Sequence, residues 1–418
     1  MIKNIIFFLS FSSYFCFAQS GSSSPFSYAG LGDINFRGTQ VNRFMGGLDV
    51  FSDSIHVNLN NPASYGDLKL TTYSLGVHYK SNLMISGDSK ESKAIAALDY
   101  LAVGIPAGKF GFGFGLIPYS SIGYKIQSIN NNDLGASIIN NYQGSGGLNQ
   151  AFLSFGVPLF KYFTTGITVN YGFGTLLYRT SQFKENVNLG TFLSNSSSLS
   201  GLNYQVSINA KIPIKKQYFL RFMYSIEPSS NFNSRNERII YTQDINGTRI
   251  SDFEKVNLDL IGKTETKLSL SEKRKFGFGF GKSKKWFIGV QKNSINSAIF
   301  GTEFMEKENI KYSSGSQFSL GGFYLPNYSS LTNYWKRIVY RFGFRKENTG
   351  LIFNSLPLKE TAFSFGVGLP MAGFSNANLG FEFGSRGEKS KSFVQENFFA
   401  FRVGFSLNDK WFLKRKYN

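Results

Sequence analysis

Val103-Gly-Ile-Pro-Ala-Gly-Lys-Phe-Gly-Phe-Gly-Phe-Gly115 contains the pattern that decides the fold: a strand, a proline, a short turn and a second strand of alternating aromatic and glycine residues. Proline cannot donate a hydrogen bond to a β-ladder and therefore belongs at strand ends. Strict alternation is typical of a strand with one face in an apolar phase. Related patterns recur at Pro158, Pro213 and Pro370. A hairpin repeated in this way, with aromatic residues on one face, predicts an all-β fold, a transmembrane antiparallel β-barrel.

The first strand of this kind shows how the two faces differ. In Thr72-Tyr-Ser-Leu-Gly-Val-His-Tyr79, the odd-numbered positions are Tyr, Leu, Val and Tyr, and the even-numbered positions are Thr, Ser, Gly and His. We expect the odd-numbered face to meet lipid, with its aromatic ends near the membrane interfaces. Runs of this type continue from Thr71 to Leu407 and predict about 14 strands.

Longer polar stretches alternate with the short, proline-marked turns. They are Ser128 to Gly147, Ser181 to Ser200, Asn231 to Lys263 and Asn293 to Ser314. In outer-membrane barrels the long connections face the outside and the short turns face the periplasm. We therefore predict that these polar stretches are extracellular loops.

The lengths of the apolar runs exclude a bundle of membrane-spanning helices. Beyond the N-terminus, no uninterrupted apolar run approaches the ~18 residues that a spanning helix requires. The 418 residues include 44 glycines and 17% aromatic residues, which suits strands with aromatic outer faces and crowded inner faces. Because the pattern does not change along the chain, we expect one large barrel rather than several soluble domains.

Residues 1–18 have the features of a secretory signal peptide. Lys3 supplies the positive start, an apolar run follows to Phe17, and Ala18 offers a small residue for cleavage. Cys16 is the only cysteine, so cleavage after Ala18 leaves a mature chain without thiols. Disulfides, zinc–thiolate sites and cysteine nucleophiles are then excluded. A signal peptide before a barrel predicts the outer membrane of a Gram-negative bacterium.

The rest of the chain divides into three parts. Residues 19–68 are rich in glycine, asparagine and proline, which argues against long helices or strands. Because this segment still carries apolar residues, we expect it to fold as a hatch inside the barrel. Residues 69–407 form the barrel, and residues 408–418 are a basic tail or the last strand.

The charge of the chain is strongly positive. Lys and Arg number 45 against 26 Asp and Glu, a formal net charge of +19. An exported barrel meets little nucleic acid, so we exclude nucleic acid as a partner. The basic residues are dispersed, and we expect them to contact the phosphates of outer-membrane lipid and lipopolysaccharide.

Signals for catalysis or cofactor binding are weak. Gly277-Phe-Gly-Phe-Gly-Lys-Ser283 resembles a phosphate-binding loop, but it lacks the required glycine at position 276 and alternates like a strand. Nothing near His56 or His78 resembles a nucleophile elbow, and two histidines without a cluster of carboxylates are a weak signal for a metal site. We therefore predict that the protein is not an enzyme and holds no metal or cofactor.

Several polar residues are expected on the lumen faces of strands. They are His78, Arg221, Arg341, Arg345, Glu382 and Arg402. One interpretation is a basic lumen that favours an anionic head group. The other, which we favour, is a lattice of ion pairs that holds the N-terminal segment in place, because a plugged barrel must satisfy its buried polar groups.

Pro118 is unusual because it lies well inside a segment long enough to span the membrane. A missing donor at this position should break strand pairing and open or kink the wall. Alternatively, Pro118 marks the place where the strand leaves the membrane. Under the first interpretation, Pro118, Tyr119 and Gly123 are the candidate residues of a lateral opening.

In several short motifs the chain resembles the FadL/TodX/OmpP1 family of outer-membrane channels, in its Bacteroidetes form. The resemblance rests on Tyr28-Ala-Gly-Leu-Gly32, Met45-Gly-Gly47, Asn61-Pro-Ala63 and Gly115-Leu-Ile-Pro-Tyr-Ser-Ser-Ile-Gly-Tyr124. It implies a barrel of about fourteen strands, an N-terminal hatch that carries Asn61, Pro62 and Ala63, and lateral exit at a kinked third strand, where Pro118 lies. The chain departs from the family by continuing beyond the usual terminal aromatic residue to Asn418.

Two functions follow from this resemblance. The leading one is passive uptake of a hydrophobic or amphiphilic, fatty-acid-like molecule through hatch rearrangement and lateral exit. The alternative is a non-transporting barrel that serves as an accessory subunit of an outer-membrane secretion or assembly complex, since PorV-like barrels share the fold. A channel should have an apolar pocket against the hatch, whereas an accessory subunit should have a filled lumen and a protein-binding surface.

Overall fold

The computed structural model describes residues 21–131, 137–215, 217–244, 248–296, 304, 309–373, 375–390 and 393–411. The predicted signal peptide, including Cys16, and most of the predicted tail lie outside these residues. Among the described residues, no helix is long and apolar enough to cross a membrane.

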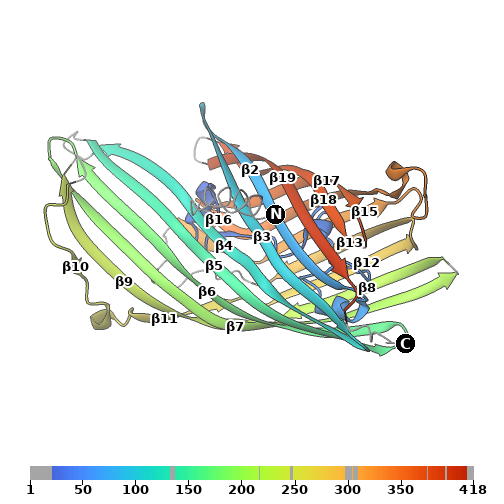
Figure 1. The fold of residues 1–418 in the computed structure, drawn as a ribbon. Coiled ribbons are helices and arrows are strands. Elements are labelled where there is room, and N and C mark those ends of the chain that lie inside the picture. Colours follow the sequence, from blue (N-terminus) through green and yellow to red (C-terminus); the bar gives the residue numbers. More distant parts are fainter. Residues whose placement is uncertain are drawn as a thin grey trace, which may run out of the picture.

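Fourteen strands form a closed antiparallel barrel (Figure 1). In order around the ring they are β2 (Thr71–Ser86), β3 (Ser89–Ala107), β4 (Phe110–Asn131), β5 (Ser137–Phe160), β6 (Phe163–Lys184), β7 (Leu189–Lys215), β8 (Tyr218–Glu227), β12 (Lys273–Lys282), β13 (Trp286–Ile295), β15 (Gly315–Tyr324), β16 (Val339–Phe353), β17 (Leu356–Pro370), β18 (Asn376–Ser390) and β19 (Phe393–Asp409). The last strand, β19, pairs with β2 from Asp409↔Thr71 to Gln395↔Ile85 and closes the ring. The predicted fold class and strand number are confirmed.

Short elements extend or cross this ring. The strands are β1 (Asp33–Ile34), β9 (Ser230–Asp244), β10 (Glu254–Lys255), β11 (Glu265–Leu270) and β14 (Ile310–Tyr312), and the helical turns are η2 (Pro25–Tyr28), α2 (Gln40–Arg43), η3 (Pro62–Asp67), η4 (Leu258–Ile261) and η6 (Tyr334–Arg337). Strand β9 takes over from β8 as the partner of β7, and β11 pairs with β9. Strands β8 and β9 together therefore act as one long strand, and so do strands β11 and β12.

The alternation of the sequence places aromatic side chains on the outside of the barrel. Tyr73, Leu75, Val77 and Tyr79 of β2 are each 38–51% exposed, as predicted for a lipid-facing row. Similar outward rows from neighbouring strands stack on one another, for example Phe363 on Phe383 with ring centroids 5.7 Å apart. Together these rows form the apolar belt that a barrel needs to sit in a bilayer.

The prediction that the long polar stretches are loops is wrong for most of their residues. Strands β4, β5, β6 and β7 contain 22, 24, 22 and 27 residues and run through much of Ser128–Gly147 and Ser181–Ser200. A membrane crossing needs only about 9–11 residues. Beyond the bilayer, both faces of a strand meet water or protein, so the apolar alternation fades while the backbone hydrogen bonds continue.

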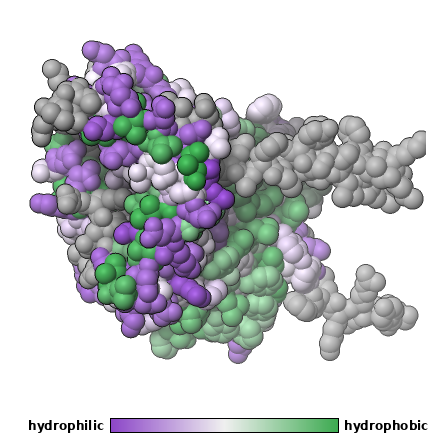
Figure 2. Space-filling model, turned by 90° about the vertical axis from the view of Figure 1, so that its left-hand side faces the viewer, coloured by the Kyte–Doolittle hydropathy of each residue, from purple (hydrophilic) through white to green (hydrophobic). Residues whose placement is uncertain are grey.

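These long strands project from one end of the barrel, which we call the tall end; the other end carries the short β3–β4, β5–β6 and β7–β8 turns. The strands β4 to β7 and β9 form a curved wall that rises beyond the rest of the ring (Figure 1). Viewed toward the tall end, the surface is mostly hydrophilic, and the continuous hydrophobic surface lies further back (Figure 2). The apolar belt is therefore confined to the part of the barrel near the short turns.

The N-terminal segment, residues 21–70, lies inside the ring and contacts the inner face of the wall. The closest approaches use wall glycines. A Cβ at Gly343 would lie 1.9 Å from the backbone nitrogen of Gly46, and a Cβ at Gly321 would lie 2.3 Å from the carbonyl oxygen of Met45. Inner-face glycines thus give the segment room to lie directly against the strands.

At the other end of the chain, β19 continues to Asp409. Asn408 and Asp409 therefore belong to the last strand, where they pair with Thr72 and Thr71. Residues 412–418 lie outside the described part of the chain.

Candidate functional site

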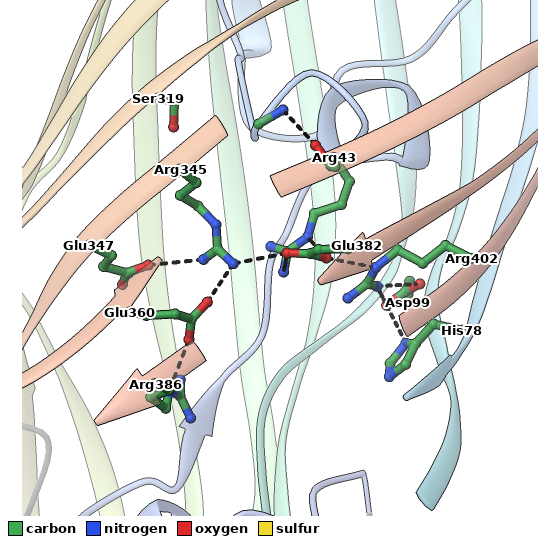
Figure 3. Close-up of polar contacts among 12 residues, drawn as sticks. Arg43, His78, Asp99, Ser319, Arg345, Glu347, Glu360, Glu382, Arg386 and Arg402 are labelled. Atoms are coloured by element: carbon green, nitrogen blue, oxygen red, sulfur yellow. Dashed lines mark hydrogen bonds and ion pairs between the residues drawn. The ribbon is translucent and has the colours of Figure 1, made fainter. Parts of the chain in front are cut away.

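The lumen contains a network of ion pairs centred on the carboxylate of Glu382 (Figure 3). Glu382 lies on β18 and is 2% exposed. Its carboxylate accepts hydrogen bonds from Arg43 Nε at 2.6 Å, Arg345 Nη2 at 3.0 Å and Arg402 Nε at 3.0 Å. Arg43 comes from α2 of the N-terminal segment, whereas Arg345 and Arg402 come from β16 and β19. The network therefore joins the segment to three strands of the wall.

One branch of the network runs from Arg345 toward the tall end. Arg345 also donates to Glu360 at 2.5 Å and to Glu347 at 3.1 Å. Arg386 Nε donates to the other oxygen of Glu360 at 2.9 Å, and Arg386 Nη1 donates to Asp33 at 2.7 Å. Because Asp33 belongs to β1, this branch returns to the N-terminal segment.

A second branch runs from Arg402 to Asp99 and His78. Arg402 Nη1 lies 3.3 Å from both oxygens of Asp99, and His78 Nδ1 lies 2.7 Å from Asp99 Oδ1. The side-chain amide of Gln40, in α2, also donates to Asp99. Asp99 points inward with the same strand parity as the buried Ile95, and the parity of β3 reverses just after it at a bulge, because the β2–β3 register passes from Gly76↔Tyr100 directly to Val77↔Leu98.

A separate cluster holds the segment against β8, β12 and β13. Arg37 donates to Glu227 at 2.5 Å, and Lys273 Nζ lies 3.7 Å from the same carboxylate. The carboxylate of Asp49 accepts from Lys275 Nζ at 3.0 Å and from Gln291 Nε2 at 3.1 Å. Buried charges are costly unless they are paired in this way.

The residues of the Asn61-Pro-Ala motif are buried against β5, β6 and β7. Asn61 Nδ2 donates to the Asp49 carbonyl at 2.9 Å and to Asn209 Oδ1 at 3.0 Å. Ser207 Oγ donates to Asn61 Oδ1 at 2.8 Å and accepts from the backbone N–H of Ala63 at 2.8 Å.

Pro62 begins η3 and packs on glycines of the wall. A Cβ at Gly166 would lie 2.4 Å from its carbonyl oxygen, and a Cβ at Gly156 would lie 2.6 Å from it. The motif thus anchors the segment to the wall by both its polar and its backbone atoms.

The remaining lumen candidates also have partners. Arg221 donates to the side-chain and backbone oxygens of Ser52 and lies 3.6 Å from Asp67. Arg341 Nη1 donates to Asn378 Oδ1 at 2.9 Å. Each of the six polar residues named from the sequence therefore points inward and is bonded, in keeping with an ion-pair lattice around the segment.

A tight turn of the segment contains the second histidine. Asp53 accepts from the backbone N–H groups of Ile55 at 3.0 Å and His56 at 2.8 Å, and its other oxygen lies 2.7 Å from His56 Nδ1. Burial by itself raises the pKa of Asp53, but the His56 ring and these backbone donors outweigh it and lower the pKa to about 2. Asp53 is therefore ionised at neutral pH.

The wall is interrupted between β3 and β4. Their pairing runs from Ala107↔Phe110 to Leu101↔Leu116. Among the described residues, β4 then pairs with β5 and with β1 but no longer with β3. The last β3–β4 pair, at Leu116, lies two residues before Pro118, and the β4–β5 register shifts between Pro118 and Ser120. We call this interruption the seam.

The N-terminal segment occupies the seam. Asp33 pairs with Ser121 and Ile34 pairs with Ser120, so β1 adds a short strand to the free edge of β4. The backbone N–H of Asn35 donates to the carbonyl of Tyr119 at 2.9 Å. The side chain of Ile34 is 38% exposed, whereas Leu31 and Arg37 on either side of β1 are buried.

The other two candidates for a lateral opening also contact this segment. Tyr119 is fully buried; its hydroxyl accepts from Lys273 Nζ at 3.0 Å, and the guanidinium of Arg37 lies 5.5 Å from its ring centroid. The N–H of Gly123 donates to Ser27 Oγ at 3.2 Å. The structure therefore brings Pro118, Tyr119 and Gly123 together at the edge that the segment covers.

A cavity of about 230 Å³ lies beside the seam and the ion-pair network. Its charged lining includes Arg43, Asp99, Lys275, Arg345, Glu360, Arg386 and Arg402. Its apolar lining includes Ile34, Phe36, Ile95, Leu351, Leu358 and Phe398. The cavity is thus amphiphilic, with cationic and anionic groups and an apolar surface within one space. In the described part of the chain, no His, Cys, Asp or Glu residues form a group of three or more that could hold a metal ion.

Several important residues were not identified from the sequence. Glu227 has the same strand parity as Arg221. Following the inward positions of β8 from Arg221 through 223 and 225 leads to Glu227. Asp99 has the same parity as the buried Ile95, but parity counted back from the alternation after Tyr100 places it outward, because a bulge lies between them. Asp33, Arg37 and Arg43 lie in irregular backbone that carries no periodic signal.

Comparisons with known proteins agree with this fold. The family model described as BamG matches residues 1–418 of the chain. No curated protein matches the sequence. The crystal structure of the toluene transporter TbuX from Ralstonia pickettii is similar, with a TM-score of 0.61 and 12% identity over 90% of this chain and 99% of TbuX.

Two further solved structures show the same similarity. The toluene transporter TodX from Pseudomonas putida has a TM-score of 0.61 and 14% identity, covering 91% of this chain and 99% of its own. A FadL homologue from Pseudomonas aeruginosa has a TM-score of 0.57 and 10% identity, with the same coverage. At these identities the similarity shows the fold, which is that of FadL-like outer-membrane barrels.

Proposed function

Because this chain belongs to the BamG family and has a FadL-like fold, we propose that it is an outer-membrane channel for passive uptake of a hydrophobic or amphiphilic small molecule. The observation that carries the proposal is the seam at Pro118, which lies beside an amphiphilic cavity and is covered by β1. In this proposal residues 21–68 are a hatch, and movement of Asp33-Ile34 away from β4 opens a lateral exit.

The lining of the cavity favours an amphiphile with an anionic head. Arginine side chains bind carboxylates strongly and with defined geometry, and the wall from Ile34 to Phe398 offers apolar surface for a chain. A volume of about 230 Å³ is smaller than the 300–1,000 Å³ typical of a ligand pocket. A fatty-acid-like molecule thus needs the hatch to move before its chain is accommodated.

The orientation that we propose follows from the two ends of the barrel. Outer-membrane barrels place short turns in the periplasm and longer extensions outside the cell. The tall end then faces outward in a Gram-negative outer membrane, after export by the N-terminal signal. A ligand enters from the tall end, passes the hatch and leaves sideways through the seam.

A reversible cross-link across the seam tests this proposal. Ile34 and Ser120 are directly opposed in antiparallel pairing, a separation compatible with a disulfide. We expect the oxidised Ile34→Cys/Ser120→Cys variant to lose uptake of radiolabelled palmitate into cells that lack their own fatty-acid channel. Reduction should restore uptake, because the lock is then removed.

The two single-cysteine variants are the matched controls, and both should take up palmitate under oxidising and reducing conditions. Since the only natural cysteine, Cys16, lies in the predicted signal peptide, no other disulfide competes. Equal uptake by the oxidised and reduced double variant would contradict lateral exit through the seam.

A second function is supported by a different observation, the dense filling of the lumen. The networks around Glu382 and Glu227 tie the segment to many strands, as expected for a barrel that serves as an accessory subunit rather than a channel. Affinity purification from native membranes in mild detergent, with mass spectrometry of proteins and lipids, separates the two functions. A stoichiometric protein partner without enriched lipid would favour the accessory function, and a lone barrel with a retained fatty acid would favour the channel.

A further inference from the structure

The outer surface of the tall end carries a pocket that is separate from the lumen. Four adjacent strands, β5, β6, β7 and β9, supply its floor in two rows. The registers place Gln143, Arg179, Ser194 and Ile239 side by side in one row. The next row consists of Asn141, Ser181, Phe192 and Tyr241. Phe253, which precedes β10, completes a pocket of about 310 Å³.

The parity of β6 shows that this pocket faces away from the lumen. Tyr171 and Phe173 belong to the exposed aromatic row of β6, and Arg179 has the same parity without an intervening bulge. The alternate residues Leu176 and Tyr178 point inward, where they are buried in an apolar cluster. The pocket therefore lies on the outer wall of the barrel, on strands β5, β6, β7 and β9.

Its height places the pocket above the apolar belt. Arg179 follows Phe173 by six positions, roughly 20 Å of strand at about 3.3 Å per residue. Between the belt and the pocket, the outward positions of β7 are Ser200, Ser198 and Ser196. In the orientation proposed above, this level is that of the sugars and phosphates outside the bilayer.

Aromatic rings form a continuous surface along one side of the pocket. The ring of Phe192 stacks on Tyr241 with centroids 5.2 Å apart and an interplanar angle of 17°. Tyr241 meets Phe253 edge to face at 5.2 Å, and Phe183 meets Phe192 edge to face at 5.6 Å. These rings are already packed on one another, so a ligand that binds their free faces pays little conformational entropy.

Polar groups on the other side of the pocket are available to a ligand. The side chains of Gln143, Arg179 and Ser194 form no hydrogen bond or ion pair with any other described residue. A second guanidinium, that of Arg249, lies 4.1 Å from the ring centroid of Phe253. The acid on the same face of β9, Glu237, is already paired with Lys255 at 2.9 Å. The pocket is therefore cationic.

We propose that this pocket binds an anionic saccharide, a sugar that carries phosphate or carboxylate groups. The rings of Tyr241 and Phe253 contact the apolar face of the sugar, and Gln143 and Ser194 bind its hydroxyl groups. Arg179 binds the anionic group in the manner of guanidinium–phosphate or guanidinium–carboxylate pairs. The sugar belongs either to lipopolysaccharide of the same membrane or to a soluble acidic glycan.

Binding to a released sugar tests the site itself. The probe is the phosphorylated core oligosaccharide of lipopolysaccharide, titrated into the detergent-purified full-length protein by calorimetry. We expect Arg179→Gln to weaken binding roughly tenfold, since hydrogen bonds to charged groups are among the strongest. Arg179→Gln should have little effect on the affinity for the phosphatase-treated oligosaccharide, which lacks the anionic group. Tyr241→Ala should weaken binding of both forms, and Tyr241→Phe should retain it.

The matched control is Arg235→Gln, which removes an exposed arginine on the same outer face of β9 outside the pocket. A loss of affinity in Arg235→Gln equal to that in Arg179→Gln would overturn the proposal, because it would indicate general electrostatic attraction. Absence of binding by the unaltered protein would also overturn it. Retained heat-modifiable gel mobility shows that each variant is folded.

A second measurement identifies the source of the sugar. Lipopolysaccharide that co-purifies from native membranes is quantified for the unaltered protein and for Arg179→Gln. Loss of this lipopolysaccharide, together with weaker oligosaccharide binding, identifies the membrane as the source. Weaker oligosaccharide binding with unchanged co-purification identifies a soluble glycan. The site rests on the proposed orientation but not on uptake, so palmitate uptake by Arg179→Gln should equal that of the unaltered protein.

Discussion

At the scale of single residues, Glu382 joins arginines from three parts of the chain in the lumen. One carboxylate satisfies three guanidiniums, from Arg43, Arg345 and Arg402. Attraction between buried opposite charges offsets the cost of removing each charge from water only while every partner is present. Such a residue holds the N-terminal segment in place more than it selects a ligand.

Neutralising Glu382 should therefore destabilise the barrel. We expect Glu382→Gln to lower the free energy of unfolding by about 3–5 kcal/mol, because three buried cations lose their shared anion. Urea titration in detergent, followed by tryptophan fluorescence, measures this change. The matched control is Glu347→Gln, whose partly exposed carboxylate bonds Arg345 alone among the residues that the structure describes. Equal effects of the two substitutions would contradict the central role of Glu382.

At the scale of elements, the seam is a consequence of one strand that changes partners. Strand β4 pairs with β3 near the short turns and with β5 along its whole length, and it accepts β1 beyond Pro118. A strand edge inside a membrane needs partners for its backbone groups. The Asp33-Ile34 backbone supplies such partners for part of the edge, so the segment replaces part of the wall.

Replacing Pro118 tests the connection between this edge and uptake. Valine restores a backbone donor and favours extended pairing. We therefore expect Pro118→Val to extend the β3–β4 ladder and to reduce palmitate uptake. Pro158→Val, at the short-turn end of β5, is the control and should leave uptake unchanged. Normal uptake by Pro118→Val would remove Pro118 from the exit route.

At the scale of the whole molecule, the barrel is asymmetric along its axis. The apolar belt occupies the part of the wall near the short turns, and β4 to β7 project well beyond it. A bilayer centred on the belt leaves the tall wall in water. The lateral seam lies between β3 and β4, and the outer pocket lies on β5, β6, β7 and β9, so the two sites are separate.

Cysteine labelling checks which end faces outward. Val187 is exposed in the β6–β7 turn of the tall end, and Lys109 is exposed in the short β3–β4 turn. A membrane-impermeant maleimide should label Val187→Cys in intact cells, and it should label Lys109→Cys only after the outer membrane is permeabilised. The reverse result would invert the proposed orientation, and with it the route of the ligand.

The alternation of Tyr73, Leu75, Val77 and Tyr79 was sufficient to predict both the barrel and its lipid-facing row. That prediction succeeds because side-chain direction in a strand is a local property with a period of two. The polar stretches were misassigned as loops because outside the bilayer the alternation is no longer imposed. Parity counted back from the alternation at the end of β3 places Asp99 outward, because a bulge lies between them.

The sequence by itself therefore determined the fold class, the strand number, the inward direction of Arg345, Glu382 and Arg402, and the unusual position of Pro118. Only the tertiary structure decided what these residues meet. Arg43 reaches Glu382 and Asp33 reaches Arg386 across more than 300 positions of the chain. Strand alternation arises from neighbouring residues. These contacts and the covered seam arise only when the ring closes around an irregular segment without periodic signal, and the outer pocket arises from the registers of β5, β6, β7 and β9.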